Sequence, residues 1–275
     1  MINFNGSLEN DSIKLFNANN RAFKYGDALF ETIKVENLKI IFLEDHYFRL
    51  MASMRMLRMY IPMNFTLEFF ENEIINTVKS NNLENARVRF TIFRNDGGYY
   101  TPVSNKTSYL VEASILKNVL KESYTLDIFK DYYVYSGLLS TVKTANKLTN
   151  VLASIYADEN ELDNCILLNE KKYVVEAING NIFIIKDNVI KTPPLIEGCV
   201  KGIMRKKIIE ILSKSEDYSI EEIAISPFEL QKADELFITN VIVGILPITN
   251  YRKKEFSSEV SKSLLQKLNI KIRLA

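Results

Sequence analysis

Strand and helix signals follow one another along this chain in mixed order, and this order constrains the fold most. The segment Arg87–Arg94 alternates polar and apolar residues with period two, which predicts a strand. The segment Thr144–Asn160 instead has apolar residues at the spacing of an amphipathic helix. There is neither a regular strand–helix–strand alternation nor an internal repeat of roughly 20–50 residues. The pattern therefore predicts an α+β fold in two halves.

The same reading assigns the remaining elements. The first half is expected to hold a hairpin, two helices and two strands: Ala28–Phe42, a helix Glu44–Met59 ended by Pro62, a helix capped by Thr66, and strands Arg87–Arg94 and Ser108–Leu116. The second half is expected to hold the helices Thr144–Asn160 and Gly202–Leu212 and the strands Cys165–Leu168, Lys172–Val175, Asn181–Ile185, Val189–Lys191, Phe237–Thr239 and Gly244–Ile248. The polar stretch 117–123 is predicted to link a domain of residues 1–116 to a domain of residues 124–275.

Composition limits the partners of the chain. The 275 residues carry 35 Lys and Arg against 34 Asp and Glu, a formal net charge of +1. This balance gives no electrostatic reason to expect nucleic acid or an anionic membrane as a partner. Apolar runs are far shorter than the roughly 20 residues of a transmembrane helix, and residues 1–20 lack the apolar core of a signal peptide. We therefore expect a cytoplasmic protein that acts on small molecules.

A single histidine, His46, narrows the chemistry. One imidazole excludes a zinc site built on several histidines, and no metal site is expected. The two cysteines, Cys165 and Cys199, have neither the density of a disulfide framework nor a metal-binding spacing. His46 itself lies in the apolar stripe of a predicted helix, where a structural role is favoured over a catalytic one. Lys, Arg, Tyr, Glu or a cofactor must therefore carry any reaction.

Three basic or amide-rich features suit a phosphorylated cofactor, although each has an ordinary structural explanation. Lys143 precedes a predicted helix at the end of an apolar stretch, where an amine can bond covalently to a carbonyl compound or simply lie in solvent. Gly202 opens another helix, whose first N–H groups can bind phosphate. Arg49 can clamp the same phosphate or be solvated. The standard glycine-rich nucleotide motifs G-x-G-x-x-G and G-x-x-x-x-G-K-[ST] are absent.

Taken in order, these segments resemble the class IV family of pyridoxal-phosphate enzymes, which includes branched-chain and D-amino-acid aminotransferases and aminodeoxychorismate lyases. The resemblance covers nearly the whole chain. It rests on the spaced matches Arg21–Thr32, His46–Leu50, Lys143–Asn146, Val175–Glu176 followed by Asn181–Phe183, Thr192–Pro194, Gly202–Arg205 and Ala233–Asn240.

The resemblance implies two α+β domains with pyridoxal 5'-phosphate between them, the fold type IV architecture. In this pattern Lys143 binds the cofactor covalently and moves protons, and Glu176 pairs with the pyridine nitrogen. The phosphate would be held by Arg49 and by the amides of Ile203 and Met204, and Val241 would also lie at the cofactor.

The resemblance also places side chains on the substrate side: Tyr25, Thr32, Arg89, Arg94 and Asn240. Arg89 and Arg94 would each hold a substrate carboxylate. The family further implies a homodimer.

Three features of the sequence bear on which member of the family this is. Lys143 and Asn146 have the shorter spacing of lyases and D-amino-acid aminotransferases. Met204 and Val241 stand where aminotransferases usually have hydroxyl residues, and Thr32 stands where the lyases have a threonine near the reacting carbon. These features favour a 4-amino-4-deoxychorismate lyase that releases pyruvate and 4-aminobenzoate. An aminotransferase for branched-chain or D-amino acids is the alternative, and a catalytically idle relative is a third.

Overall fold

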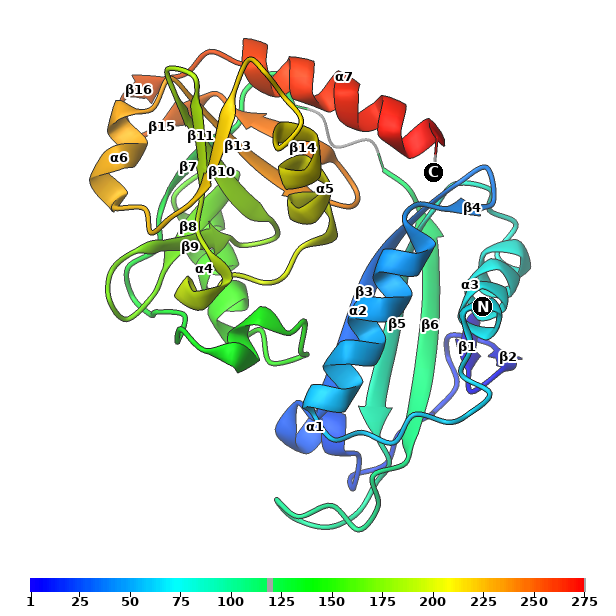
Figure 1. Ribbon diagram of the computed structural model, residues 1–275. Helices are drawn as coiled ribbons and strands as arrows, with labels where there is room; N and C mark the ends of the chain where they lie inside the picture. The colour runs from blue at the N-terminus through cyan, green and yellow to red at the C-terminus, as the bar shows by residue number, and fades with distance from the viewer. Residues whose placement is uncertain (118–120, 275) are drawn as a thin grey trace. The chain divides into compact units, whose positions relative to one another are not determined.

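The chain forms two compact units, each described here by itself. The computed structural model describes residues 1–117 and 121–274 (Figure 1). The first unit holds Met1–Lys117 together with Lys143–Asn146, and the second holds the described residues of 118–142 and 147–275. Of the predicted linker 117–123, residues 118–120 lie outside the described residues. The sequence-based division placed Lys143–Asn146 in the second domain, whereas these residues cluster with the first unit because they pair with one of its strands.

An antiparallel six-stranded sheet forms the centre of the first unit, in the order β2-β1-β6-β5-β3-β4. Its strands are β1 (Ile2–Phe4), β2 (Ser7–Glu9), β3 (Ala28–Glu36), β4 (Lys39–Ile40), β5 (Ala86–Arg94) and β6 (Thr107–Ile115). The predicted hairpin is confirmed as β3 and β4, and both further strands are confirmed as β5 and β6. The β3–β5 register pairs Glu31 with Phe90 and Thr32 with Arg89, so each pair shares one face of the sheet.

Two helices lie along one face of this sheet, α2 (Leu43–Met56) and α3 (Leu67–Ser80) (Figure 1). The Thr66 side chain accepts a hydrogen bond from the Phe69 amide at 3.2 Å, which confirms the predicted cap of α3. Helix α2 ends three residues before the predicted Met59, because the chain turns at Arg58 with a φ of 55° before the proline is reached. A short helix, α1 (Arg21–Tyr25), precedes β3 and was not predicted.

The second unit contains two five-stranded sheets that share one apolar core. One has the order β12-β11-β10-β13-β14 and the other β16-β15-β7-β8-β9. The strands are β7 (Thr125–Ile128), β8 (Asn164–Leu168), β9 (Val174–Ala177), β10 (Asn181–Lys186), β11 (Val189–Thr192), β12 (Ser219–Glu222), β13 (Glu235–Asn240), β14 (Gly244–Ile248), β15 (Asn250–Tyr251) and β16 (Lys254–Glu255). One apolar core takes side chains from both sheets, among them Leu126, Ile166, Ile182 and Leu236. The strands predicted near residues 165, 172, 181, 189, 237 and 244 are confirmed within a few residues.

Four helices accompany these sheets among the described residues of the second unit. They are α4 (Leu148–Glu159), α5 (Ile203–Leu212), α6 (Pro227–Lys232) and α7 (Glu259–Leu274), with 3₁₀ turns at Leu138–Thr141 and Leu195–Glu197. Helix α4 packs on β8, where Ala153 and Ala157 meet Cys165 and Leu167. The predicted start of this helix at Thr144 is wrong by four residues, because Thr144 is bridged to Leu29 in extended conformation.

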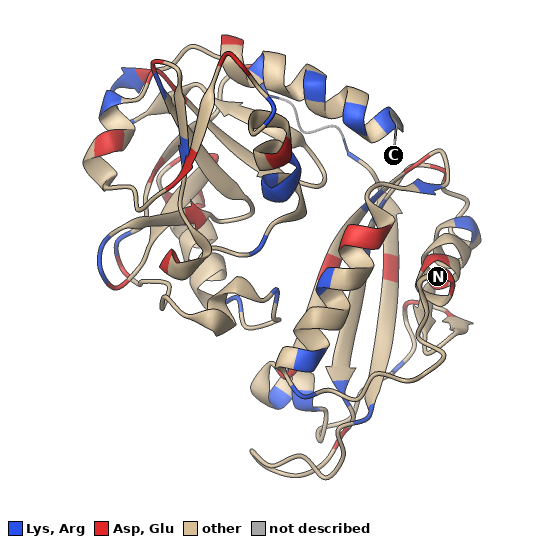
Figure 2. Ribbon diagram, in the orientation of Figure 1, with Lys and Arg blue, Asp and Glu red and all other residues tan. Residues whose placement is uncertain are grey.

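Charged side chains of both signs are spread along the two units (Figure 2). Lys and Arg predominate along α7 in this view. Among the residues that the structure describes, every helix is too short or too polar to cross a bilayer.

Candidate active site

Lys143 lies at the edge of β3 in the first unit. The Phe30 amide donates to the Lys143 carbonyl at 3.0 Å, and the Ala145 amide donates to the Ala28 carbonyl at 2.9 Å. Two backbone hydrogen bonds thus attach the lysine segment to β3, where Thr144 forms an isolated β-bridge with Leu29. The Lys143 Nζ lies 4.3 Å from the centre of the Phe30 ring, within the range of a cation–π contact. The sheet edge and one aromatic ring together set the position of the amine.

Arg89 contacts the same aromatic ring. Its guanidinium carbon is 3.9 Å from the centre of the Phe30 ring, and its Nε donates to the Thr91 hydroxyl at 3.2 Å. Burial lowers the pKa of Arg89, and the neighbouring Arg87 adds to that effect while Glu112 opposes it. Thr32 is the register partner of Arg89 and lies on the same face. The structure therefore brings together three predicted site residues, Lys143, Arg89 and Thr32, around Phe30.

A second contact ties the lysine segment to the end of α1. The Asn146 side-chain amide donates to the Gly26 carbonyl at 3.2 Å. Gly26 has a φ of 63°, and a Cβ atom there would lie 2.1 Å from the Asn146 Oδ1, so only glycine fits both the backbone and the contact. Tyr25 immediately precedes this turn, and its ring lies 5.6 Å from that of Tyr100.

Arg49 lies on α2 in a buried cluster with Glu31 and His46. The Arg49 Nε donates to Glu31 Oε1 at 2.8 Å and its Nη2 donates to Glu31 Oε2, while the His46 Nδ1 lies 2.7 Å from Glu31 Oε2. Burial alone would raise the pKa of Glu31, but the charge of Arg49 and the hydrogen bonds from His46 and Arg49 outweigh it and lower the pKa to about 2. Burial lowers the pKa of His46, against the opposing effect of Glu31. The structural role favoured for His46 fits this geometry, whereas Glu31 was not singled out from the sequence.

Arg94 lies on the face of β5 opposite to Arg89. Its guanidinium donates to Asp27 at 2.9 Å, to the backbone carbonyls of Leu57 and Arg58, and to the Asn105 side chain. The side chain is 8% exposed. These contacts attach the chain after α2 and the loop after β5 to the sheet, and the structure does not group Arg94 with Lys143 and Arg89.

Glu176 lies on β9 in the second unit, beside the loop that leads into α5. It is buried, and its Oε2 accepts a hydrogen bond from the Val200 amide at 2.9 Å. The nearby Cys199 thiol is buried as well, and burial raises its pKa to about 12, so this thiol stays protonated. Val200 lies two residues before Gly202, the glycine that opens α5. The hydrogen bond from its amide therefore places the buried Glu176 carboxylate near the start of this helix.

Helix α5 begins without a side-chain cap among the described residues, with Gly202 at the N-cap position. Asn181 holds this turn: its amide donates to the Val200 carbonyl at 2.9 Å, and a Cβ on Gly202 would lie 2.0 Å from its Oδ1. The first-turn amides of Ile203 and Met204 therefore remain suited to an anion. Asn181 is part of the motif Asn181–Phe183 named in the sequence analysis, but no role was predicted for it. Its contact with the loop before α5 exists only in the folded chain.

Asn240 and Val241 form a turn next to the same end of the sheet. Asn240 Oδ1 accepts from the amides of Ile242 and Val243 at 3.0 and 3.2 Å, and its Nδ2 donates to the Asn179 carbonyl at 3.1 Å. A Cβ on Gly180 would lie 2.7 Å from the Thr239 carbonyl oxygen, so glycine allows the two turns to approach. Because Asn181 pairs with Thr239, this turn, Glu176 and the start of α5 converge within the second unit.

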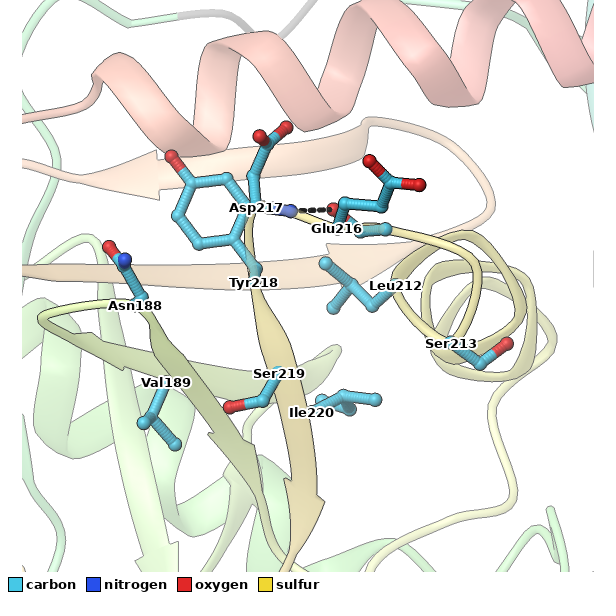
Figure 3. Close-up of a pocket in the computed structure, with 10 residues that line it drawn as sticks. Asn188, Val189, Leu212, Ser213, Glu216, Asp217, Tyr218, Ser219 and Ile220 are labelled. Atoms are coloured by element: carbon cyan, nitrogen blue, oxygen red, sulfur yellow. Dashed lines mark hydrogen bonds between the residues drawn. The ribbon is translucent and has the colours of Figure 1, made fainter.

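A hollow of about 490 Å³ lies elsewhere in the second unit, at the far end of α5 (Figure 3). Leu212, Tyr218 and Ile220 are among its lining residues, and the Asp217 amide donates to the Ser215 hydroxyl beside it. None of the predicted site residues lines it. It therefore has no part in the candidate active site.

The groups described above match the needs of a phosphorylated carbonyl cofactor. Lys143 offers a positioned amine, the uncapped start of α5 and Arg49 offer anion-binding donors, and Glu176 offers a buried carboxylate for a ring nitrogen. In the first turn of α5, the buried Arg205 Nε is without a hydrogen-bond partner among the described residues. This set of donors fits pyridoxal 5'-phosphate.

Comparison with known proteins assigns the family. The model of the family described as "Amino-transferase class IV" matches residues 28–251. A Methanocaldococcus jannaschii protein named "Putative branched-chain-amino-acid aminotransferase" is 31% identical over 90% of this chain and 87% of its own length. The aminodeoxychorismate lyase of Vibrio harveyi is 28% identical over 86% of this chain and 87% of its own length. The chain belongs to the class IV aminotransferase family, which confirms the predicted resemblance.

A solved structure shows the shared fold. The branched-chain aminotransferase of the archaeon Thermoproteus uzoniensis, solved with norvaline, matches with a TM-score of 0.89 over 98% of this chain and 94% of that chain, at 22% identity. The predicted two-domain α+β fold of the fold type IV enzymes is thereby confirmed. Pyridoxamine 5'-phosphate, the amino form of the expected cofactor, is bound in another solved aminotransferase of this fold.

Proposed function

We propose that this chain is a pyridoxal-phosphate-dependent aminotransferase that moves an amino group between amino acids and 2-oxo acids, with branched-chain or D-amino acids as donors. The cofactor follows from the family and from the donor set of the site. The relative at 31% identity, named for branched-chain amino acids, supports aminotransfer more strongly than the relative at 28% supports the lyase reaction. The comparisons thus favour the alternative of the sequence analysis over its first choice.

Four groups of this chain would hold the cofactor. Lys143 would bind it through its amine, Glu176 would pair with the pyridine nitrogen, and Arg49 together with the amides of Ile203 and Met204 would bind the phosphate. When bound, pyridoxal 5'-phosphate draws electrons away from the carbon that bears the substrate amino group. With the cofactor bound, Lys143 Nζ would take up the proton of that carbon and deliver it to the cofactor's former carbonyl carbon, while the negative charge of Glu176 would keep the ring nitrogen protonated.

The observation that carries the substrate class is the shared Phe30 ring. Arg89 and Lys143 both lie about 4 Å from its centre. A carboxylate bound by Arg89 therefore places the rest of a small amino acid within reach of the lysine amine. We assign the carboxylate contact to Arg89 and give Arg94, whose guanidinium is engaged by protein groups, a structural role. Tyr25, Asn240 and Val241 remain proposed lining residues, and a homodimer remains the proposed assembly.

The second candidate is 4-amino-4-deoxychorismate lyase. One observation favours it: the Thr32 hydroxyl lies opposite Arg89 in register, where it could protonate a leaving group beside a bound carboxylate. The apolar Met204 and Val241 also fit this enzyme better than the usual aminotransferase pattern. Both activities share the cofactor and Lys143, so the residues around the lysine do not separate them.

The covalent role of Lys143 is tested by borohydride reduction of the cofactor-loaded protein, followed by peptide mass spectrometry. We expect the pyridoxyl group on Lys143. The nearest competitor is Lys147, the residue before the first turn of α4. A label on Lys147, or no label at all, would contradict the assignment.

A half-reaction separates the two activities. The loaded protein is mixed with one amino acid and no acceptor, using leucine, valine, isoleucine, D-alanine and D-glutamate in turn. An aminotransferase releases one equivalent of 2-oxo acid per active site and then stops until a 2-oxo acid acceptor is added. A lyase releases none with any donor but forms 4-aminobenzoate continuously from 4-amino-4-deoxychorismate, and that result would replace our first proposal by the second.

A further inference from the structure

Glu31 is a carboxylate that the proposed function does not use, and it is 1% exposed. It follows Phe30 and precedes Thr32 on β3, but its side chain lies on the opposite face of the sheet, toward α2. There it meets Arg49 through two hydrogen bonds and His46 through one. One strand thus supplies both the ring that contacts the lysine amine and the carboxylate that holds Arg49.

Of the three members of this cluster, Arg49 is the most accessible to solvent. The Arg49 side chain is 13% exposed, against 2% for Glu31 and 0% for His46. A carboxylate that meets the Nε and Nη2 of one guanidinium fixes the plane of that group, because both hydrogen bonds lie in the plane. His46 in turn fixes the carboxylate. Since an ionised carboxylate only accepts hydrogen bonds, the His46 Nδ1 carries the hydrogen of this contact.

Stability alone does not account for this arrangement. A buried ion pair is on average no more stabilising than apolar side chains of the same volume, because both charges lose their hydration. Helix α2 already packs against β3 and buries Leu50, Met51 and Met54. The His46 Nε2 is moreover buried without a hydrogen-bond partner among the described residues, which costs free energy. What the cluster supplies is a fixed orientation of one guanidinium.

We propose that Glu31 is a positioning residue for Arg49: it fixes the guanidinium in the orientation that binds the cofactor phosphate, and His46 fixes Glu31. This inference rests on the proposed phosphate-binding function of Arg49. Glu31 touches neither cofactor nor substrate in this role. Its contribution is that Arg49 does not have to be ordered when the phosphate binds.

The test compares pyridoxal 5'-phosphate with pyridoxal, which lacks only the phosphate. Equilibrium dialysis of the full chain gives the dissociation constant of each compound and hence their ratio, the phosphate preference. In Glu31→Gln and Glu31→Asp we expect pyridoxal phosphate to bind about 10- to 100-fold more weakly and pyridoxal to bind unchanged. The Gln variant removes the charge and keeps the length, whereas the Asp variant keeps the charge and shortens the reach.

Glu235→Gln is the matched control. Glu235 is 2% exposed and is held by the Ser261 side chain and by the amides of Val260 and Ser261, none of which is a proposed cofactor-binding residue. We expect this variant to lose stability and to keep the phosphate preference of the wild type. Equal effects of Glu235→Gln and Glu31→Gln on that preference would overturn the inference.

A double-mutant cycle with Arg49→Lys shows whether Glu31 acts through Arg49. Lysine keeps the charge but has no planar fork to orient, so Glu31→Gln should then weaken pyridoxal phosphate binding by less than about 2-fold. The inference would be overturned if the fold losses in pyridoxal phosphate affinity of the two single variants multiplied in the double variant. It would also be overturned if Glu31→Gln bound pyridoxal phosphate more tightly because a negative charge is removed. If Arg49→Lys leaves the phosphate preference unchanged, the proposed function of Arg49 itself fails.

A change at His46 leaves both charged residues of the ion pair in place, and it serves as the test if the Glu31 variants do not fold. In His46→Asn the side-chain amide can replace the Nδ1 donor, and we expect the phosphate preference to be retained. In His46→Leu the donor is lost, and we expect weaker pyridoxal phosphate binding with unchanged pyridoxal binding. Identical preferences in the Asn and Leu variants would contradict the role given to the cluster.

Discussion

Arg89 and Arg94 are five residues apart on one strand, and an odd spacing places side chains on opposite faces of a sheet. Arg89 therefore lies with Phe30 and Lys143, while Arg94 lies with Asp27 and Asn105. The expectation that both arginines hold substrate carboxylates treated them as equivalent. The alternation of the strand, which is already visible in the sequence, separates the two.

We predict different defects in Arg89→Met and Arg94→Met. Loss of a charge-assisted contact to the substrate carboxylate should raise the KM of Arg89→Met about 10- to 100-fold while its unfolding free energy stays within about 0.5 kcal/mol of the wild type. Arg94→Met leaves buried acceptors unpaired, so its unfolding free energy should fall by at least about 2 kcal/mol. Steady-state kinetics and urea unfolding measure the two effects. A KM of Arg89→Met like that of the wild type would place carboxylate binding elsewhere, with Tyr25 and Asn240 next in line.

For Glu176→Gln we predict retained cofactor binding with most activity lost. The amide can still accept the Val200 hydrogen bond, but it carries no charge to hold the pyridine nitrogen protonated. Turnover should fall by at least about 100-fold, while the visible spectrum shows the cofactor still bound. Turnover close to that of the wild type would make Glu176 a structural contact of the loop before α5.

Among the elements, the edge of β3 has the largest effect on the site. The segment Lys143–Asn146 adds to this edge instead of beginning α4, and Asn146 attaches it to the Gly26 turn. The four-residue segment is thereby held at both ends, at Lys143 by the backbone of β3 and at Asn146 by the Gly26 carbonyl. A lysine in the first turn of a helix would have had a different backbone and different neighbours.

The Gly26 turn gives a prediction at this scale. Gly26→Ala places a side chain at a φ of 63° and against Asn146, so we expect a loss of about 1–2 kcal/mol of unfolding free energy and a slower reaction. Gly137→Ala is the control, because its backbone is extended and a Cβ there has no heavy atom within 4 Å. Urea unfolding of both variants, with activity assays, is the measurement. Equal stability of the two variants would show that the contact between Gly26 and Asn146 does not hold the lysine segment.

At the scale of the whole molecule, the Glu31 cluster makes stability depend on pH. Burial keeps the pKa of His46 below its ordinary value of 6.5, so on acidification the unfolded chain takes up this proton before the folded chain does. Stability is therefore full above pH 6.5 and falls as the pH drops below it. The pKa of Glu31, about 2 instead of 4.5, acts in the same direction, and its contribution is lost between pH 4.5 and 2.

Because His46 is the only histidine, the first of these two losses can be measured separately. We predict that the unfolding free energy of the wild type falls more steeply between pH 6.5 and 5 than that of His46→Asn, by up to about 1.4 kcal/mol per pH unit. Urea unfolding at several pH values gives both slopes. Parallel slopes would mean that His46 titrates in the folded protein as it does in the unfolded chain.

Local sequence patterns predicted most elements because the periodicity of apolar residues and the capping residues act over a few positions. The hairpin of β3 and β4, the Thr66 cap and strand β5 are examples. The short elements α1 and β12 and the C-terminal helix α7 were not predicted from these signals. The start of α4 was misplaced because Thr144 pairs with Leu29, a residue of β3 that lies 115 positions earlier in the chain. A pattern read over a few neighbouring residues contains no information about such a distant partner.

The sequence by itself determined the family, the α+β class and the identity of the groups that can do the chemistry, since motif order and residue type are properties of the chain alone. Only the tertiary structure decided which of these groups meet. It placed Arg89 and Lys143 at one Phe30 ring, turned Arg94 to the other face, and paired Glu31 with Arg49 across α2 and β3. The physical reason is that the position of a charge in a protein depends on strand register and on buried partners, and both join residues that lie far apart in the chain.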